Sequence, residues 1–127
     1  IKNNNRFLQI YDNRWKCWLF PYFRSTQNNN KENIDLSISN LLKIQLSTKY
    51  IAQAKHCKYS VSDGVYKIYN HKLYMIRLDE LPEYMDKDEF EIGDKVFKWL
   101  SIGEMEEDFD IMSKNDDVIA FVKKRCC

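Results

Sequence analysis

Aromatic rings and cations alternate along residues 50–77, and these residue types together are suited to binding a nucleotide. Rings stack on bases, at about 1–3 kcal/mol per base, while lysine and arginine neutralise phosphate. We select the following candidate ligand-binding residues from this segment: Lys58, Tyr59, Tyr66, Lys67, Tyr69 and His71. Strand alternation predicts Val65, Lys67 and Tyr69 on one face and Tyr66 and Ile68 on the other. The alternative is a tyrosine-rich sheet with solvated lysines, because tyrosine favours strands.

Tyr22 and Arg24 are further candidate ligand-binding residues, because they follow Pro21 at the end of a predicted strand, next to Phe23. A guanidinium group can hold a phosphate through two parallel hydrogen bonds. The alternative is a solvated arginine at the rim of a site.

The remaining reactive side chains do not form a recognisable catalytic or metal motif. His56 and His71 have no evident nucleophile partner, so we expect surface or core roles and regard a hydrolase built on Cys57 as weak. Cysteines stand at positions 17, 57, 126 and 127 without zinc-site spacing, and we expect reduced thiols. The acids at 104, 106, 107 and 108 could house a metal, but a solvated helix face is favoured. We therefore predict no catalytic residue, no metal and no cofactor.

The net charge of +1 conceals two opposed halves. Residues 1–78 hold 13 lysines and arginines against 4 acids, and residues 79–127 hold 7 against 15. Such asymmetry suggests a basic region for an anion and an acidic region apart from it. We expect the anion to lie on residues before Leu78.

Length and composition exclude several classes of protein. With 127 residues, of which 44% are hydrophobic, the sequence predicts one domain over residues 1–127 with a true core. No run of 18 apolar residues is present to span a membrane, and the polar residues 2–5 do not resemble a signal peptide. Because the chain begins with Ile1, we expect a fragment whose missing N-terminal part holds further elements, such as a membrane anchor.

Local patterns predict the order β-β-α-β-β-β-β-α-α. The expected strands are Arg6–Tyr11, Trp15–Phe20, Lys49–Ser60, Val65–Tyr69, Leu73–Leu78 and Lys95–Leu100, with a hairpin turn at Asn70-His71. Glu32–Ile44 is an expected helix capped by Asn33, and Asn28–Asn30 an expected loop. Asp79–Asp94, with eight acids and one lysine, is expected to be an exposed loop. Ser101 and Glu104 form the pattern of a capping box, and Asp116 or Asp117 is expected to start the final helix.

Two stretches resemble the Nudix family: Leu19-Phe20-Pro21-Tyr22-Phe23, and Val96–Ser101 with Glu104-Met105. The resemblance implies an α/β fold, a Nudix-like mixed β-sheet sandwich flanked by helices, in which the loop with Tyr22 and Arg24 approaches the ligand. It also locates Ser37, Asn40 and Leu41 where Nudix hydrolases carry the carboxylates that hold Mg²⁺. Neutral groups cannot form that cage, so we expect no hydrolysis by the usual mechanism.

A Nudix fold without its metal box is similar to the SMODS-associated Nudix-like domain of bacterial anti-phage signalling. Residues 15–23, Lys58-Tyr59-Ser60 and residues 66–71 carry this likeness, which adds Ser60 to the candidate ligand-binding residues. The likeness implies a non-catalytic domain that senses a cyclic di- or oligonucleotide and forms a homo-oligomer. It also implies that this domain lies at the cytoplasmic face of the bacterial inner membrane, joined to membrane helices that this sequence does not contain. No DNA or RNA duplex is expected as a partner. The alternatives are a divergent Mg-dependent pyrophosphatase acting on a nucleoside diphosphate derivative, and a protein-interaction module.

Overall fold

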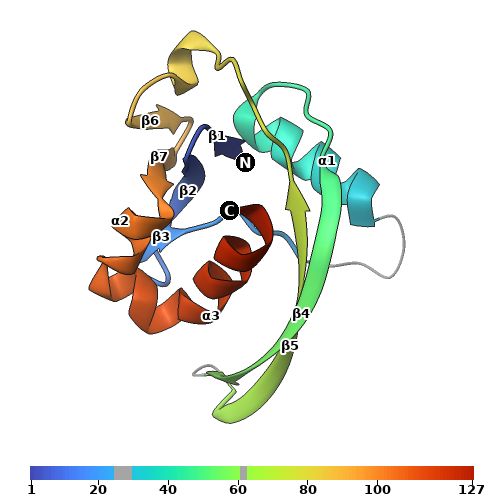
Figure 1. Cartoon of the computed structure of the whole chain (residues 1–127), viewed down its shortest axis with the longest axis vertical. Coiled ribbons are helices and arrows are strands. Elements are labelled where there is room, and N and C mark those ends of the chain that lie inside the picture. The colour runs from blue at the N-terminus through green and yellow to red at the C-terminus, as the bar shows by residue number, and fades with distance from the viewer. Residues whose placement is uncertain (25–29, 61–62) are drawn as a thin grey trace.

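A computed structural model describes residues 1–24, 30–60 and 63–127 (Figure 1). The elements, in chain order, are β1 (Lys2–Asn3), β2 (Arg6–Asp12), β3 (Cys17–Leu19), α1 (Asn30–Leu42), β4 (Lys49–Ser60), β5 (Val65–Met75), the 3-10 helix η1 (Glu83–Met85), β6 (Glu89–Ile92), β7 (Lys95–Ser101), α2 (Ile102–Glu106) and α3 (Phe109–Cys126). The expected combination of helices and sheets in an α/β fold is therefore present. No helix within the described residues combines the length and apolarity that a membrane crossing requires.

Five strands form one sheet in the order β1-β2-β7-β6, with β3 also paired to β2. All of these pairings are antiparallel, and Phe7 lies opposite Leu100 while Leu8 lies opposite Trp99. An isolated parallel bridge joins Lys2 to Arg77. Successive residues of a strand point to opposite faces, so each strand pair contributes to both sides of the sheet.

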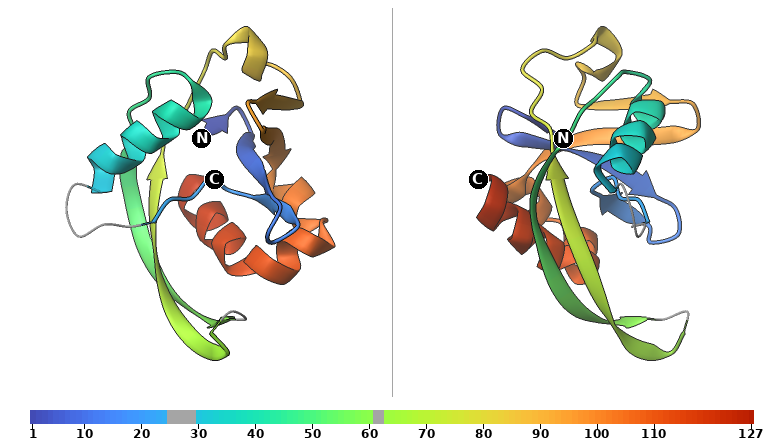
Figure 2. Two further views of the ribbon diagram at one scale, coloured as in Figure 1. Left: turned by 180° about the vertical axis from the view of Figure 1, so that it is seen from behind. Right: turned by 90° about the vertical axis from the view of Figure 1, so that its right-hand side faces the viewer.

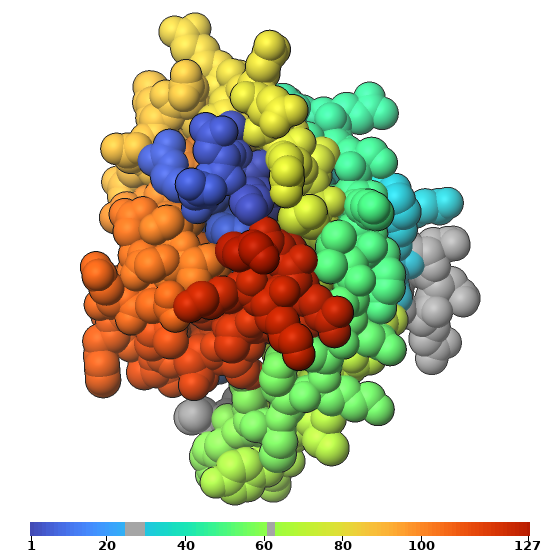
Figure 3. Space-filling view, viewed as in Figure 1, coloured from blue at the N-terminus to red at the C-terminus, as the bar shows by residue number. Residues whose placement is uncertain are grey.

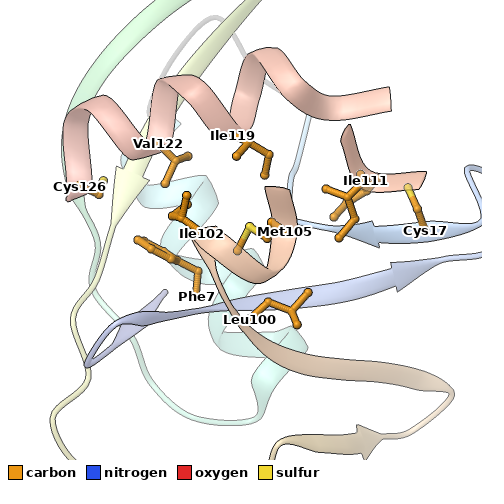
Figure 4. Close-up of a cluster of buried hydrophobic side chains, with 10 residues drawn as sticks. Phe7, Cys17, Leu100, Ile102, Met105, Ile111, Ile119, Val122 and Cys126 are labelled. Carbon is orange, nitrogen blue, oxygen red and sulfur yellow. The ribbon is translucent and has the colours of Figure 1, made fainter. Parts of the chain in front are cut away.

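The two faces of this sheet carry separate hydrophobic clusters, and helices cover both faces. Phe7 and Leu100 pack with residues of α2 and α3, including Met105 and Ile119 (Figure 4). On the other face Leu8, Phe97 and Trp99 pack with residues of α1 such as Leu42. Figure 2 shows the sheet strands between α1 and α3. The main body is thus a three-layer arrangement of helix, sheet and helix.

The long hairpin of β4 and β5 forms a second, two-stranded sheet beside α3. It is curved, and its tip extends beyond the rest of the molecule (Figure 1). The expected turn at Asn70-His71 is wrong, because β5 runs continuously through both residues and pairs with Lys55 and Ala54 of β4. The cross-strand hydrogen bonds of this long ladder outweigh the local turn preference of asparagine.

Helix boundaries agree with the sequence where a capping side chain makes its bond. The Ser101 hydroxyl accepts from the Glu104 amide at 3.1 Å, and the Glu104 carboxylate accepts from the Ser101 amide at 3.0 Å, which confirms the capping box. Asn33 is not a cap, because α1 begins at Asn30. The final helix begins at Phe109 and is capped by Asp108, earlier than the expected start at Asp116 or Asp117. The backbone of Asn115 is non-helical, so the helix is interrupted just before the expected start.

The acidic segment is also more ordered than expected. Residues 79–94 contain η1 and β6, and their Met85 and Phe90 side chains are buried. The acids remain exposed because the strand alternates, with Glu89 and Glu91 outward and Phe90 inward. Asn28 and Asn29 of the expected loop lie outside the described residues.

Candidate functional site

The candidate ligand-binding residues of the hairpin lie on two opposite faces. The register pairs Lys58 with Lys67, and Tyr59 with Tyr66. Residues directly opposite in an antiparallel pair share a face. One face therefore carries Lys58, Ser60, Lys67, Tyr69 and His71, and the other carries Tyr59 and Tyr66. The predicted alternation along β5 is confirmed, but it separates the Tyr59 and Tyr66 rings from the cations with which the sequence grouped them.

The two lysines of the first face each bond to a carboxylate. Lys58 lies 2.9 Å from Asp117 of α3, and Lys67 bonds to Asp63. The hydrogen bond from Lys67, together with its charge, lowers the pKa of Asp63. We expected the acids after Leu78 to lie mostly apart from the basic residues, but Asp117 bonds to Lys58 and Asp88 bonds to Arg6. Helix α3 packs against the hairpin and supplies Asp117, a contact that depends on tertiary structure (Figure 3).

His71 and His56 contact each other, although the sequence treated them as solitary. Their Nδ1 atoms lie 2.7 Å apart, and Asp117 Oδ2 lies 3.6 Å from Nδ1 of His56. The His71 ring stacks on Tyr69 with an interplanar angle of 7°, and Phe121 of α3 meets the His56 ring edge-on. Burial, followed by the charges of Lys58 and His56, lowers the pKa of His71. Sequence reasoning did not select His56 or Asp117 as site residues. The signal that would have found the histidine pair is the pairing of the strand after Ala52 with the strand that runs through Asn70 and His71.

Tyr59 and Tyr66 form an exposed pair near the hairpin tip. Their rings meet edge-on with centroids 5.2 Å apart, and 53% and 74% of each residue is exposed. Ser60, in contrast, is buried, and its hydroxyl bonds to Asp63 at 3.4 Å. Ser60 is therefore part of the hairpin's internal packing.

Tyr22 and Arg24 lie in different surroundings despite their closeness in sequence. The Tyr22 hydroxyl donates to Asp12 Oδ2 at 3.2 Å and accepts from Arg14 at 3.2 Å, so Tyr22 is held at the turn between β2 and β3. Arg24 instead lines a small pocket between the segment after β3, the first half of α1 and β5.

The pocket at Arg24 combines cations, rings and neutral polar groups. It is lined by Phe23, Arg24, Asn30, Asn33, Ile34, Ser37, Lys72 and Tyr74. None of these described lining residues carries a carboxylate. Burial, followed by the electrostatic influence of Tyr50 and Asp35, raises the pKa of Tyr74, so its hydroxyl keeps its proton near neutral pH. Ser37 occupies one of the positions that the resemblance assigns to Nudix carboxylates, and Lys72 is a lining cation that the sequence did not select.

The lining residues of α1 lie along one side of its first turns, from Asn30 to Ser37. The arrangement is thus suited to an anion that also presents an apolar or aromatic group to Phe23 and Tyr74.

No protein-family model, curated protein or solved structure matches this chain.

Proposed function

We propose that this chain is a non-catalytic, Nudix-like module that binds a nucleotide through one of its phosphates in the Arg24–Lys72 pocket. The observation that carries the proposal is a pocket with two cations and two rings, and no carboxylate among its described lining residues. The first candidate ligand is a cyclic di- or oligonucleotide, which the resemblance implies. In this proposal a homo-oligomer passes the signal to a membrane effector at the cytoplasmic face of the bacterial inner membrane.

The dimensions of the pocket favour a phosphate group over a whole nucleotide. Its volume is about 60 Å³, whereas pockets that enclose small-molecule ligands have about 300–1,000 Å³. Arg24 can bond a phosphate with two parallel N–H donors, and Lys72 adds a second positive charge. The sugar and base would then lie outside the pocket, where Phe23 and Tyr74 offer ring surface for stacking.

The position of α1 supports binding without hydrolysis. The helix covers one face of a sheet whose other face packs on α2 and α3, a layering that fits a Nudix-like sandwich. Ser37 lines the pocket, and Asn40 and Leu41 follow on the same helix. A hydroxyl, an amide and an alkyl side chain do not provide the carboxylate oxygens that Mg²⁺ needs beside a pyrophosphate.

A binding panel tests the proposal. The purified chain is mixed with cyclic di- and trinucleotides, a nucleoside diphosphate derivative and inorganic phosphate, and the melting temperature and calorimetric affinity are measured. We expect at least one cyclic nucleotide to raise the melting temperature, because a ligand of the native state stabilises it. If no nucleotide shifts the melting temperature at millimolar concentration, the proposal is wrong. Mg²⁺-dependent phosphate release would instead support the pyrophosphatase alternative.

Matched lysine and arginine variants locate the ligand. We expect Arg24→Met or Lys72→Met to weaken nucleotide binding about 10- to 100-fold, since hydrogen bonds to charged groups contribute about 1.5–3 kcal/mol each. Lys55→Met removes one charge from β4 and does not touch the pocket, so its affinity should stay within about twofold of the parent. Lys67→Met tests the hairpin itself. Loss of binding in Lys67→Met but not in Arg24→Met would move the ligand to the hairpin and refute the pocket.

A further inference from the structure

We propose that His56, His71 and Asp117 bind one divalent transition-metal ion of the zinc class, and that this ion fastens the β4–β5 hairpin to α3. The three residues come from three elements: β4, β5 and α3. One ligand atom from each lies within 4.8 Å of the other two. The site is separate from the Arg24 pocket and does not depend on the proposed nucleotide binding.

The distances within this cluster are close to those of a tetrahedral metal centre. Zinc lies about 2.0–2.2 Å from nitrogen and oxygen ligands, which puts two tetrahedral ligand atoms about 3.3 Å apart. The Nδ1 atoms of His56 and His71 are 2.7 Å apart, and His56 Nδ1 is 3.6 Å from Asp117 Oδ2. To match this spacing the first distance must lengthen by about 0.6 Å and the second shorten by about 0.3 Å, while the third pair of ligand atoms lies within 4.8 Å. In the metal-free protein the short Nδ1–Nδ1 contact requires one Nδ1–H donor. When both Nδ1 atoms bind a metal ion, that proton moves through solvent to Nε2 of the same ring, which stays neutral.

Neighbouring side chains also fix the orientation of each ligand. Lys58 bonds to Oδ1 of Asp117 at 2.9 Å and leaves Oδ2 directed to His56. Tyr69 stacks on His71, and Phe121 contacts the His56 ring. Ring contacts that hold the imidazoles in this way are typical of metal sites, and their loss weakens metal affinity. The side chains of His56 and Asp117 are each 20% exposed, so an ion has access from solvent.

The ligand set determines the class of metal. Two imidazole nitrogens and one carboxylate oxygen suit Zn²⁺ and its neighbours Co²⁺, Ni²⁺ and Cu²⁺, whereas Mg²⁺ prefers oxygen ligands. Three protein ligands leave a fourth position for water. The lysine next to Asp117 is a competing cation, so zinc affinity is expected to rise when its charge is removed.

Metal titration of the whole chain tests this site. The protein is stripped with a chelator, kept reduced, and titrated with ZnCl₂ and CoCl₂, while calorimetry measures the affinity and stoichiometry and visible absorption reports the geometry of bound Co²⁺. We expect one ion per chain, a raised melting temperature with Zn²⁺, and no shift with MgCl₂. The titration uses a Cys57→Ser/Cys127→Ser background, because both thiols are exposed and thiols also bind zinc.

Variants separate metal ligation from folding. His71→Phe keeps an aromatic ring against Tyr69 but has no ligand atom, and we expect its zinc affinity to fall at least about 100-fold. Asp117→Asn should also lose affinity, and Lys58→Met should bind zinc several-fold more tightly than the parent. The metal-free melting temperature of His71→Phe shows whether the fold is intact, and His56→Ala gives a second ligand deletion.

The proposal is refuted by any of three results: no zinc binding at 1:1 in the Cys57→Ser/Cys127→Ser background, equal binding by His71→Phe, or weaker binding by Lys58→Met. The nucleotide panel needs no added zinc and involves a different site, so a failure of the metal site leaves the nucleotide result unaffected.

Discussion

Asp35 joins α1 to the start of β4, and its removal should destabilise the protein more than any other acid on that helix. Its Oδ1 accepts from the Thr48 amide at 2.8 Å and from the Thr48 hydroxyl at 2.5 Å. Its Oδ2 accepts from Lys31 at 2.6 Å. Thr48 is buried, with 7% of its surface exposed. Asp35→Ala therefore leaves two buried donors of Thr48 without a carboxylate acceptor.

The size of this effect follows from the cost of unpaired donors. Each buried donor left unsatisfied costs about 1–3 kcal/mol, so we expect the free energy of unfolding to fall by about 2–4 kcal/mol in Asp35→Ala. Lys31→Ala removes a half-exposed ion pair and an exposed hydrogen bond to the Ser47 hydroxyl, and it should cost under about 1 kcal/mol. Urea denaturation at pH 7 measures both variants. The variants Asp35→Ala, Thr48→Val and their combination form a double-mutant cycle, in which we expect a coupling energy of about 1–3 kcal/mol.

The dependence on pH gives an independent test of the same contacts. Burial acts to raise the pKa of Asp35, but the hydrogen bonds from Lys31 and Thr48 outweigh it and lower the pKa below its ordinary value. A carboxyl with a lowered folded pKa stabilises fully above its unfolded pKa, and this stability is lost as pH falls through the folded value. The stability difference between the parent and Asp35→Ala should therefore narrow below about pH 4. A difference that widens at low pH, or a cost no larger than that of Lys31→Ala, would refute the reasoning.

Two further predictions concern the body of the fold. Trp99→Phe should lower the free energy of unfolding by about 2–4 kcal/mol, because the buried indole Nε1 donates to the Met85 carbonyl at 2.9 Å and the smaller ring leaves a void. The control is Trp15→Phe, at a residue that is 42% exposed. It should lower the free energy of unfolding far less in the same urea titration. Ser101→Ala removes the capping-box acceptor and should cost about 1 kcal/mol by urea denaturation; a cost below about 0.3 kcal/mol would show that the cap contributes little to α2.

Elements with a strong local signal were predictable. The strand at Lys95–Ser101 and the long strand at Lys49–Ser60 follow alternating or β-favouring residues, and the Ser101–Glu104 cap depends on residues three apart. Interactions between residues so close in the chain depend mainly on local residue types and spacing, so they can be predicted from the sequence. The expected turn at Asn70-His71 is wrong, because local preference alone predicts it, whereas all eleven residues of β5 pair with β4.

The candidate site was predictable in its chemistry but not in its grouping. The sequence showed an excess of rings and cations before Leu78, and it singled out Arg24 as a phosphate ligand. The sequence did not group Arg24 with Lys72, which is 48 positions later in the numbering. The two residues line the same pocket because β5 packs near α1. The sequence also did not foresee that Asp117 would neutralise Lys58.

Residue types and local spacing thus determined the strands at 49–60 and 95–101, the cap at Ser101, and which side chains are able to bind an anion. Only the tertiary structure decided which of them meet. Strand register placed His71 beside His56, and the packing of α3 on the hairpin brought Asp117 to both His56 and Lys58. The physical reason is that register and helix packing are set by burial over the whole chain, so contacts between distant residues cannot be read from the neighbours of either one.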